Sequence, residues 1–314
     1  MVREPLVSVI IPTYNRSGLI CTAIDSVIAQ TYASTEIIVV DDGSTDDTRS
    51  VLQRYGDRIR LLSQENSGPA AARNKGIAAA RGEYIAFLDS DDYWLPEKLT
   101  RQIEALEKAG PSVPCCLCNC TVLYRDGSRT STFKIAGIGS DQPAGLWLNP
   151  GAVLSTRFVI FNQAAAIRRQ ALERIGGFDE KLRLLEDYDL SLRLALDGPW
   201  TIIRDELVVY NDATPGSLAT EARLDELPLR EYQVRVRERI SALIESRPQH
   251  ADLRGLAKRE LRRARRELIV ARLMRRKSRM VSILGRSLRF VENVRQGFFR
   301  RSPLFPSVVV QPFS

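Results

Sequence analysis

The chain has 314 residues, of which 44% are hydrophobic, so it can form one large or two moderate globular domains. No apolar run reaches the roughly 18 residues of a membrane span, and Met1–Pro5 is too short and mixed in charge to begin a signal peptide, so we expect neither feature. The net charge of +8 is unevenly distributed: residues 230–302 hold 22 Lys and Arg against 7 Asp and Glu, and the remainder holds 24 against 31.

The N-terminal third alternates short apolar runs with amphipathic stretches. The predicted strands are Val7–Ile11 (ended by Pro12), Glu36–Val40, Ile59–Leu62 and Tyr84–Leu88, and the predicted helices cover residues 19–28, 47–55 and an alanine-rich stretch after Pro69. Strands that alternate with helices in this way pair in parallel through right-handed crossovers. We therefore expect an α/β fold.

The fourth predicted strand leads directly into Asp89, Ser90, Asp91 and Asp92. In open α/β sheets ligands bind just outside the carboxyl ends of the strands, so these carboxylates would lie at the rim of a cleft. Carboxylates packed this closely repel one another unless a hard divalent cation shares them. The alternative is an Asp-rich turn that caps the helix expected from about Pro96.

The second half of the chain is less regular. We expect a helix from Pro96 to Gly110, and then a strand from Cys115 to Tyr124 with a hairpin turn at Asp126-Gly127. An acceptor-side loop is expected over residues 135–152. It is followed by a strand over Phe158–Ile167 and a helix from Arg168 that ends at Gly176-Gly177. Glu186 and Asp187 then open another helix. Acidic residues in a first helical turn stabilise the helix dipole whatever their function, so capping is the alternative to a catalytic role.

Four of the five cysteines lie between Cys115 and Cys120. A zinc site would need a second ligand pair farther along, and the single histidine, His250, is remote in sequence. We therefore expect these thiols to be reduced core residues, which fits a cytoplasmic location.

Several common nucleotide-binding and hydrolytic motifs are absent. The glycine fingerprint of dinucleotide binding is replaced by Pro12-Thr13-Tyr14-Asn15, and the chain contains neither a P-loop nor a G-x-S-x-G motif. An α/β domain without those loops must neutralise phosphate by other means, and a metal held by Asp91 and Asp92 would do so.

With these residues in view, the chain resembles the inverting, nucleotide-sugar-dependent glycosyltransferases of family 2, which have the GT-A fold. The resemblance extends from residue 6 to about 210. The motifs occur in order at Val7–Asn15, Glu36–Asp46, Asn66–Gly76, Gly82–Asp92, and Gly176–Asp179 followed by Glu186–Leu190. The resemblance implies a mostly parallel sheet flanked by helices, in a domain over residues 1–222 with a nucleotide-sugar-binding half (1–110) and an acceptor-side half (111–222).

The resemblance also implies roles for individual residues. The base and ribose of a uridine-type nucleotide would be held by Pro12, Tyr14 and Asp42, with Asn15, Asp41 and Ser90 in the same donor site. The DxD motif would be formed by Asp89 and Asp91, and Asp91, with Asp92 beside it, would bind the ribose and a Mn²⁺ or Mg²⁺ ion on the diphosphate. Arg73 would lie near the phosphates, and Asp187 would be the general base.

These roles predict a metal-assisted single displacement in which one sugar moves from a nucleotide-sugar, with UDP as the expected carrier, to a hydroxyl of a glycan or lipid-linked acceptor. The Q-x-x-R-W motif of processive members is missing, so we expect one transfer per encounter. A nucleotidyltransferase of related fold is the alternative enzyme, although its glycine-rich loop after the first strand is absent. A non-catalytic scaffold that acts through the basic tail is the alternative of another class.

Residues 223–314 are expected to form a basic helical extension. Apolar residues recur at helical spacing among arginines in Leu253–Lys277, and a second helix is expected over Val281–Phe299. Such helices can pack on the mildly acidic body or contact the cytoplasmic face of a membrane, which would suit a lipid-linked acceptor. Binding of nucleic acid is the least favoured reading.

Overall fold

The computed structural model describes residues 4–139, 142–157, 159, 161–212, 214, 226–284 and 306–313. The chain divides into two compact units, Met1–Thr214 with Val308–Ser314, and Pro215–Ser307. The predicted boundary between residues 222 and 223 lies outside the described residues. The end of the chain, Val308–Ser314, groups with the first unit and not with the extension that the sequence predicts over residues 223–314.

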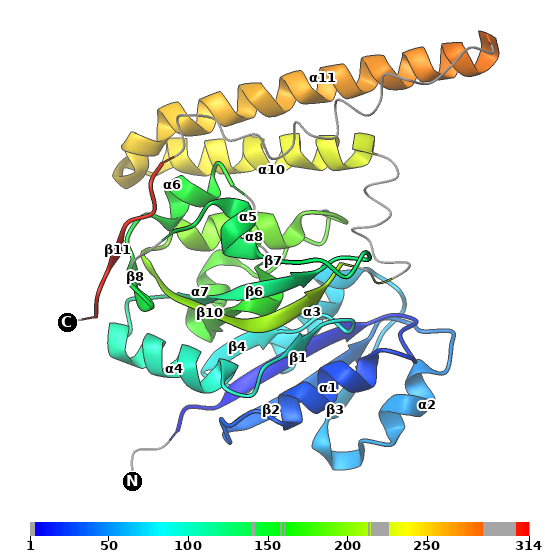
Figure 1. The fold of residues 1–314 in the computed structure, drawn as a ribbon, viewed down its shortest axis with the longest axis vertical. Helices are drawn as coiled ribbons and strands as arrows, with labels where there is room; N and C mark the ends of the chain where they lie inside the picture. Colours follow the sequence, from blue (N-terminus) through cyan, green and yellow to red (C-terminus); the bar gives the residue numbers. More distant parts are fainter. Residues whose placement is uncertain are drawn as a thin grey trace. The chain divides into compact units, whose positions relative to one another are not determined.

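A single mixed sheet forms the centre of the first unit (Figure 1). Its main path runs in the order β11-β8-β10-β6-β9-β4-β1-β2-β3, with β5 paired to β10 and β7 to β6. The strands are β1 (Val7–Thr13), β2 (Thr35–Asp41), β3 (Arg60–Ser63), β4 (Tyr84–Phe87), β5 (Tyr93–Trp94), β6 (Cys115–Leu123), β7 (Arg129–Ser131), β8 (Ala144–Trp147), β9 (Ala165–Arg168), β10 (Trp200–Asn211) and β11 (Val310–Gln311).

The half formed by β3, β2, β1 and β4 is parallel, as the alternation of strands and helices predicts. Strand β1 continues through Pro12, where we had expected it to end, and pairs Thr13 with Asp41. This is possible because β4 pairs with β1 only as far as Ile10, so Pro12 lies where β1 has one neighbour. The ends of β1 and β2 therefore lie side by side.

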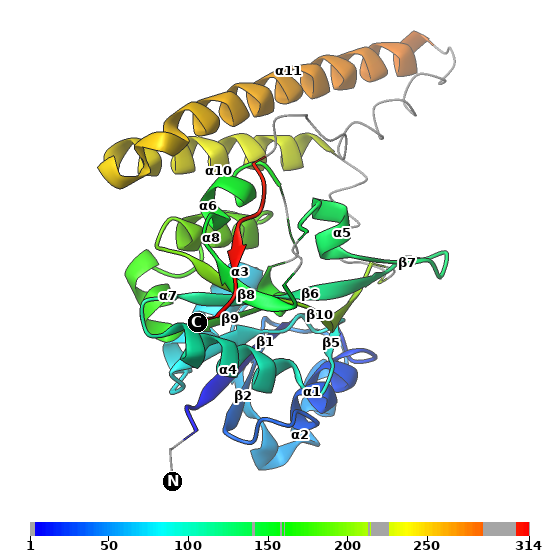
Figure 2. The same ribbon diagram turned by 60° about the vertical axis from the view of Figure 1, so that its left-hand side comes forward.

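Helices cover both faces of this sheet. They are α1 (Ile20–Ile28), α2 (Thr48–Gln53), α3 (Pro69–Ala79), α4 (Lys98–Ala109), α5 (Thr132–Ala136), α6 (Pro150–Leu154), α7 (Arg169–Ile175) and α8 (Glu186–Ala195). Figure 2 shows α1 and α4 on one face and α3, α7 and α8 on the other. Helix α3 packs so closely on β1 at Gly76 that a Cβ atom at this position would lie 2.4 Å from Cγ2 of Ile10. This packing fixes the side chains that α3 directs toward the end of β4.

The structure differs from the prediction in the second half of the sheet. Residues 135–152, expected to form a loop, contain β8 and α6. Within the expected strand Phe158–Ile167, Asn162–Ala164 form a 3₁₀ turn and only Ala165–Ile167 belong to a strand, β9, whereas residues 158 and 160 lie outside the described residues. Strand β9 lies antiparallel between β4 and β6, so this part of the sheet is mixed. The sequence does not predict β10, whose charged centre, Arg204–Glu206, coincides with register shifts against β6.

The clustered cysteines are core residues, as expected. Cys115, Cys116, Cys118 and Cys120 are buried free thiols in β6, and Cys118 Sγ donates to the Ala164 carbonyl at 3.3 Å. Burial raises the pKa of the Cys116 thiol to about 12, which keeps it protonated. Within the described residues, no group of three or more His, Cys, Asp or Glu side chains is arranged to hold a metal.

The second unit is helical, with α10 (Glu226–Ser246), a 3₁₀ turn (Pro248–Leu253) and α11 (Arg254–Leu284). The predicted helix over Leu253–Lys277 is confirmed over most of its length, and most of the one expected over Val281–Phe299 lies outside the described residues. Val234 on α10 packs with Ala264 and Leu268 on α11. None of the described helices is both long enough and apolar enough to span a membrane.

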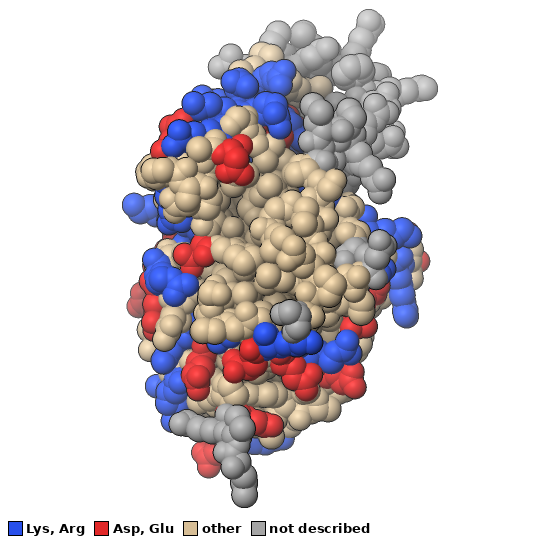
Figure 3. Space-filling model, turned by 90° about the vertical axis from the view of Figure 1, so that its left-hand side faces the viewer, with Lys and Arg blue, Asp and Glu red and all other residues tan. Residues whose placement is uncertain are grey.

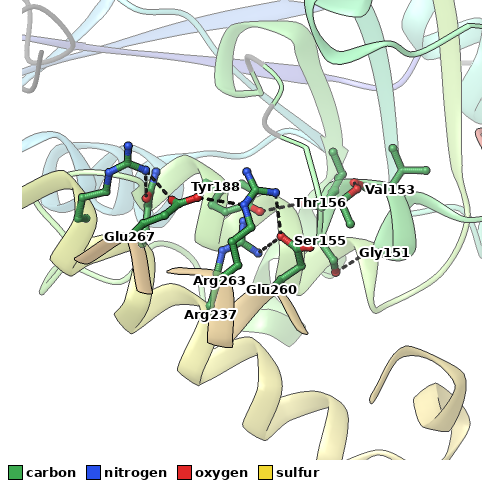
Figure 4. A network of polar contacts seen from close by, with 12 residues as sticks. Gly151, Val153, Ser155, Thr156, Tyr188, Arg237, Glu260, Arg263 and Glu267 are labelled. Atoms are coloured by element: carbon green, nitrogen blue, oxygen red, sulfur yellow. Dashed lines mark hydrogen bonds and ion pairs between the residues drawn. The ribbon is translucent and has the colours of Figure 1, made fainter. Parts of the chain in front are cut away.

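Ion pairs reinforce this helical unit. Figure 4 shows Glu260 close to Arg237 and Arg263, at 3.8 and 3.6 Å, and Glu267 at 3.0 Å from Arg263. On the face drawn in Figure 3, Lys and Arg side chains gather over the helices of this unit.

Candidate active site

The loops after β1 and β2 are joined into one rim by Asn15. Its Oδ1 accepts from the backbone N–H of Thr45 at 2.8 Å, and its own N–H donates to Ser44 Oγ at 2.9 Å. Asn15 has a φ of 52°, a left-handed conformation that asparagine adopts more readily than most residues. Asp41, at the end of β2, accepts from the Ser44 N–H at 3.0 Å. Both residues thus shape the proposed donor site through its backbone.

Asp42 is a buried anchor for the turn before α3. Its Oδ1 accepts from Gln64 Nε2 at 2.8 Å and from the Ser67 N–H at 2.9 Å, and its Oδ2 accepts from the Gly68 N–H at 2.8 Å. Three donors to one carboxylate hold this turn firmly. Pro12 is also buried, whereas Tyr14 is 43% exposed. Of the three residues predicted to hold the base and ribose, Tyr14 therefore has the side chain most open to a ligand.

The acidic run after β4 contains carboxylates in different environments. Asp89 is 29% exposed and Asp91 is half-buried, while Ser90 is buried. Asp92 is 1% exposed and accepts from Gln163 Nε2 at 2.7 Å and from the Asn211 N–H at 2.8 Å. Burial, and then the neighbouring Asp89, raises the pKa of Asp91. This crowding of negative charge would be relieved by a cation.

The carboxylates of Asp89, Asp91 and Asp92 fit a divalent cation only in part. Mg²⁺ and similar ions are commonly held by one or two carboxylates together with substrate phosphate oxygens. Asp89 and Asp91, which lie close enough to raise a pKa and are both partly exposed, fit that pattern. Asp92 fits it poorly, because each of its oxygens already accepts a hydrogen bond from the protein.

Arg73 brings the early and late acidic clusters together. Its Nη2 donates to Asp89 at 2.7 Å and its Nη1 to Glu186 at 2.8 Å, and its side chain is 5% exposed. The Asn162 side-chain oxygen, when turned toward the guanidinium, accepts from Arg73 Nη1 at 3.3 Å and from Nη2 at 3.2 Å. The centre of the Phe178 ring lies 5.4 Å from Arg73 Cζ. The guanidinium predicted to lie near phosphates is therefore enclosed by protein groups.

Helix α8 begins at Glu186, next to the Arg73 guanidinium. Leu185, immediately before it, has a φ of 63°, which is strained for a leucine, and the chain then turns into Glu186 and Asp187. Glu186 is bound by Arg73, whereas half-buried Asp187 accepts from the N–H of Tyr188 at 2.7 Å. Burial, followed by the negative charge of Glu186, raises the pKa of Asp187 to about 7, and Arg73 opposes that rise.

A buried polar network holds α8 in place. Arg193 pairs with Asp189 at 2.8 Å and donates to the carbonyls of Ile175 and Gly177, both at 2.7 Å. Asn74, next to Arg73 on α3, donates to the Phe178 carbonyl at 3.0 Å and accepts from its N–H at 2.9 Å. The Gly176-Gly177 turn is thus fastened to both α3 and α8.

Sequence reasoning missed Asn162, Gln163 and the end of β10. Asn162 and Gln163 are polar residues within a mostly apolar segment, and that was the available signal. Both are nearly fully buried and point their amides at Arg73 and Asp92 respectively. Arg73, Asp89 and Asp187, which we had predicted, do come together, whereas Asp92 serves as an anchor.

Comparison with known sequences gives a consistent result. The model of the family described as Glycosyl transferase family 2 matches residues 8–176. An uncharacterized glycosyltransferase of Rickettsia prowazekii is 36% identical over 187 residues, 60% of this chain and 58% of its own length. The uncharacterized glycosyltransferase EpsJ of Bacillus subtilis is 31% identical over 246 residues, 74% of this chain and 69% of its own. The putative teichuronic acid biosynthesis glycosyltransferase TuaG of B. subtilis is 50% identical over 105 residues, 32% of this chain and 42% of its own.

Solved structures share the fold. S. aureus TarS 1-349 in complex with UDP-GlcNAc superposes with a TM-score of 0.64 at 23% identity, covering 82% of this chain and 70% of that one. The mannosyltransferase PcManGT from Pyrobaculum calidifontis, in complex with GDP-Man and Mn2+, gives 0.59 at 24% identity, covering 94% and 80%. At these identities the likeness establishes the fold.

Proposed function

This chain belongs to glycosyl transferase family 2, and on that premise we propose that it moves one sugar from a nucleotide-sugar to an acceptor hydroxyl with inversion at the anomeric carbon. The observation that carries the proposal is the meeting of Asp89 and Glu186 on one buried arginine, Arg73. It supports a site in which donor-side carboxylates and the start of α8 act on the same substrate.

In the proposed reaction the acceptor oxygen attacks the anomeric carbon from the side opposite the diphosphate. The new carbon–oxygen bond forms as the bond to the phosphate oxygen breaks, and the nucleoside diphosphate leaves with the electron pair. Asp187 takes the proton of the hydroxyl. A pKa near 7 suits a base that works at neutral pH.

On the donor side, Tyr14 would cover the base, while Asn15, Asp41 and Asp42 would hold the loops that surround it. A bound Mn²⁺ or Mg²⁺, held by Asp89 and Asp91, would neutralise the charge that develops on the departing diphosphate. The UDP-GlcNAc complex of TarS supports UDP as the carrier.

For the acceptor we propose a glycan or lipid-linked hydroxyl, a choice that the name of the relative TuaG supports. We also propose a peripheral contact between the second unit and an anionic membrane surface. Arg259, Arg262 and Arg266 are all on α11, and they have no ion-pair partner among the described residues. Ile269 and Leu273 continue along the same helix and are 56% and 58% exposed.

A panel of UDP-, GDP-, dTDP- and CDP-sugars, each with Mn²⁺, tests the donor class by thermal shift, because a ligand bound by the native state raises the melting temperature. We expect UDP-sugars to give a shift of several degrees and the others little. A melting temperature that no nucleotide-sugar or nucleoside diphosphate changes would contradict the proposal.

A further inference from the structure

Arg73 lies between two carboxylates that are far apart in the sequence of the first unit. Asp89 follows β4 and Glu186 opens α8, and both bind the same guanidinium at 2.7 and 2.8 Å. The side chains of Arg73 and Glu186 are only 5% and 11% exposed. An ion pair this well buried is geometrically fixed, since breaking it would leave an uncompensated charge.

This pairing distinguishes Glu186 from its neighbour Asp187. Glu186 Oε1 is bound to the guanidinium, whereas the protein hydrogen bond to Asp187 comes from the N–H of the next residue. With Glu186 engaged and nearly buried, Asp187 is the more open of the two.

The same arrangement argues against direct phosphate binding by Arg73. Its two terminal nitrogens already donate to carboxylates, and the Asn162 oxygen lies within 3.3 Å of both. Its Nε is buried and has no partner among the described residues. A phosphate would have to displace a carboxylate from a site closed to solvent.

We propose that Arg73 is a positioning residue: it binds Glu186 and thereby leaves Asp187 as the proton acceptor. This rests on the proposed function. The charged groups that act on Asp187 are Glu186 on the same helix, Arg73 on α3 and Asp89 after β4. The positive charge of Arg73 favours the ionised form of Asp187, and the two negative charges disfavour it.

The test is the pH profile of sugar transfer at saturating donor for Glu186→Gln and Arg73→Gln, together with the donor dissociation constant of each variant. We expect Glu186→Gln to move the acid limb of the profile to lower pH by about one unit, because a negative neighbour is lost. Arg73→Gln should move it to higher pH by a similar amount, and both should keep donor affinity within about threefold.

Arg193→Gln is the matched control, because it removes another buried arginine, in the last turn of α8, that is ion-paired with Asp189 in the first turn of the same helix. It should lower the melting temperature and leave the acid limb in place. A merely structural Arg73 would behave like Arg193, and an unchanged limb in Glu186→Gln or Arg73→Gln would overturn the proposal. So would a loss of donor affinity of tenfold or more in Arg73→Gln with the limb unmoved, the result expected of a phosphate ligand.

If Arg73→Gln does not fold, Glu186→Gln and Arg73→Lys still decide the matter. Arg73→Lys keeps the positive charge, so its acid limb should stay within about half a unit of that of the wild type, and a larger displacement would contradict the proposal. Failure of the proposed function is recognised separately, because the wild-type protein would then transfer no sugar at all.

Discussion

At the scale of single residues, the carboxylates after β4 have separate tasks in this structure. Asp91 is half-buried beside Asp89, while Asp92 is enclosed and accepts from Gln163 and Asn211. Sequence alone could not separate them, because both are aspartates in one acidic run. Their contacts predict different consequences on substitution.

We predict that Asp91→Asn weakens the Mn²⁺ dependence of donor binding by tenfold or more and leaves the melting temperature unchanged or higher, since a crowded negative charge is removed. Asp92→Asn should instead destabilise the fold by about 1–3 kcal/mol, because its amide nitrogen would face Gln163 Nε2 or the Asn211 N–H and leave a buried donor unpaired. Thermal denaturation and a Mn²⁺ titration measure the two effects. The reverse pattern would identify Asp92 as the metal ligand.

At the scale of elements, the sequence predicted the first four strands and the helices between them, because buried parallel strands appear as short β-branched runs. It did not predict β10, whose charged residues occupy a bulge, or the 3₁₀ turn Asn162–Ala164, whose polar side chains serve the site. Arg73, Asp89 and Asp187 were identifiable from their motifs. The pairing of Arg73 with Glu186 was not, because it depends on tertiary packing.

Helix α4 carries a fully buried lysine, Lys98, which makes stability depend on pH. The Lys98 side chain is fully buried, with its Nζ 2.7 Å from Gln102 Oε1 and 3.8 Å from the centre of the Trp94 ring. Burial lowers the pKa of Lys98 to about 8, an effect that the nearby cysteines of β6 oppose. The unfolded chain, with a lysine pKa of about 10.4, therefore binds more protons between these two values, and stability rises with pH there.

We predict that Lys98→Met removes this dependence. Between pH 8 and pH 9.5 the wild type should gain about 1.5 kcal/mol of unfolding free energy relative to the variant, measured by urea denaturation at each pH. The thiols of β6 stay protonated in the fold and titrate near pH 8.5 only in the unfolded chain, and this contribution is common to both proteins and largely cancels in the difference. A constant difference across this pH range would contradict the prediction, because it would show that Lys98 stays protonated in the folded protein up to pH 9.5 and that burial does not lower its pKa.

At the scale of the whole molecule, the charge asymmetry of the sequence has a structural counterpart. The second unit carries the basic residues on α10 and α11, and several of them pair internally, as Arg265 does with Glu238 at 2.7 Å. Others on α11 have no such partner among the described residues. The unpaired arginines are those available to an anionic surface.

We predict that the full-length protein binds vesicles containing phosphatidylglycerol and not vesicles of phosphatidylcholine alone. Replacing Arg259, Arg262 and Arg266 by Gln should weaken binding on the order of 100-fold, at about 1 kcal/mol per basic residue, as measured by co-sedimentation. Lys258, Arg265 and Arg272, which pair with Glu245, Glu238 and Glu231, provide a control of equal charge loss. Equal losses in both variants would favour a nonspecific charge effect, and no vesicle binding by the wild type would contradict the membrane contact.

We propose that this family member transfers sugar with Asp187 as its base. The most direct measurement compares the wild type with Asp187→Asn in donor affinity and in the rate of acceptor-dependent release of nucleoside diphosphate, at pH 7–8. We predict that the variant binds donor within about threefold of the wild type and loses transfer by about 10²–10⁴-fold. A variant that transfers sugar at the wild-type rate would show that Asp187 is not the base.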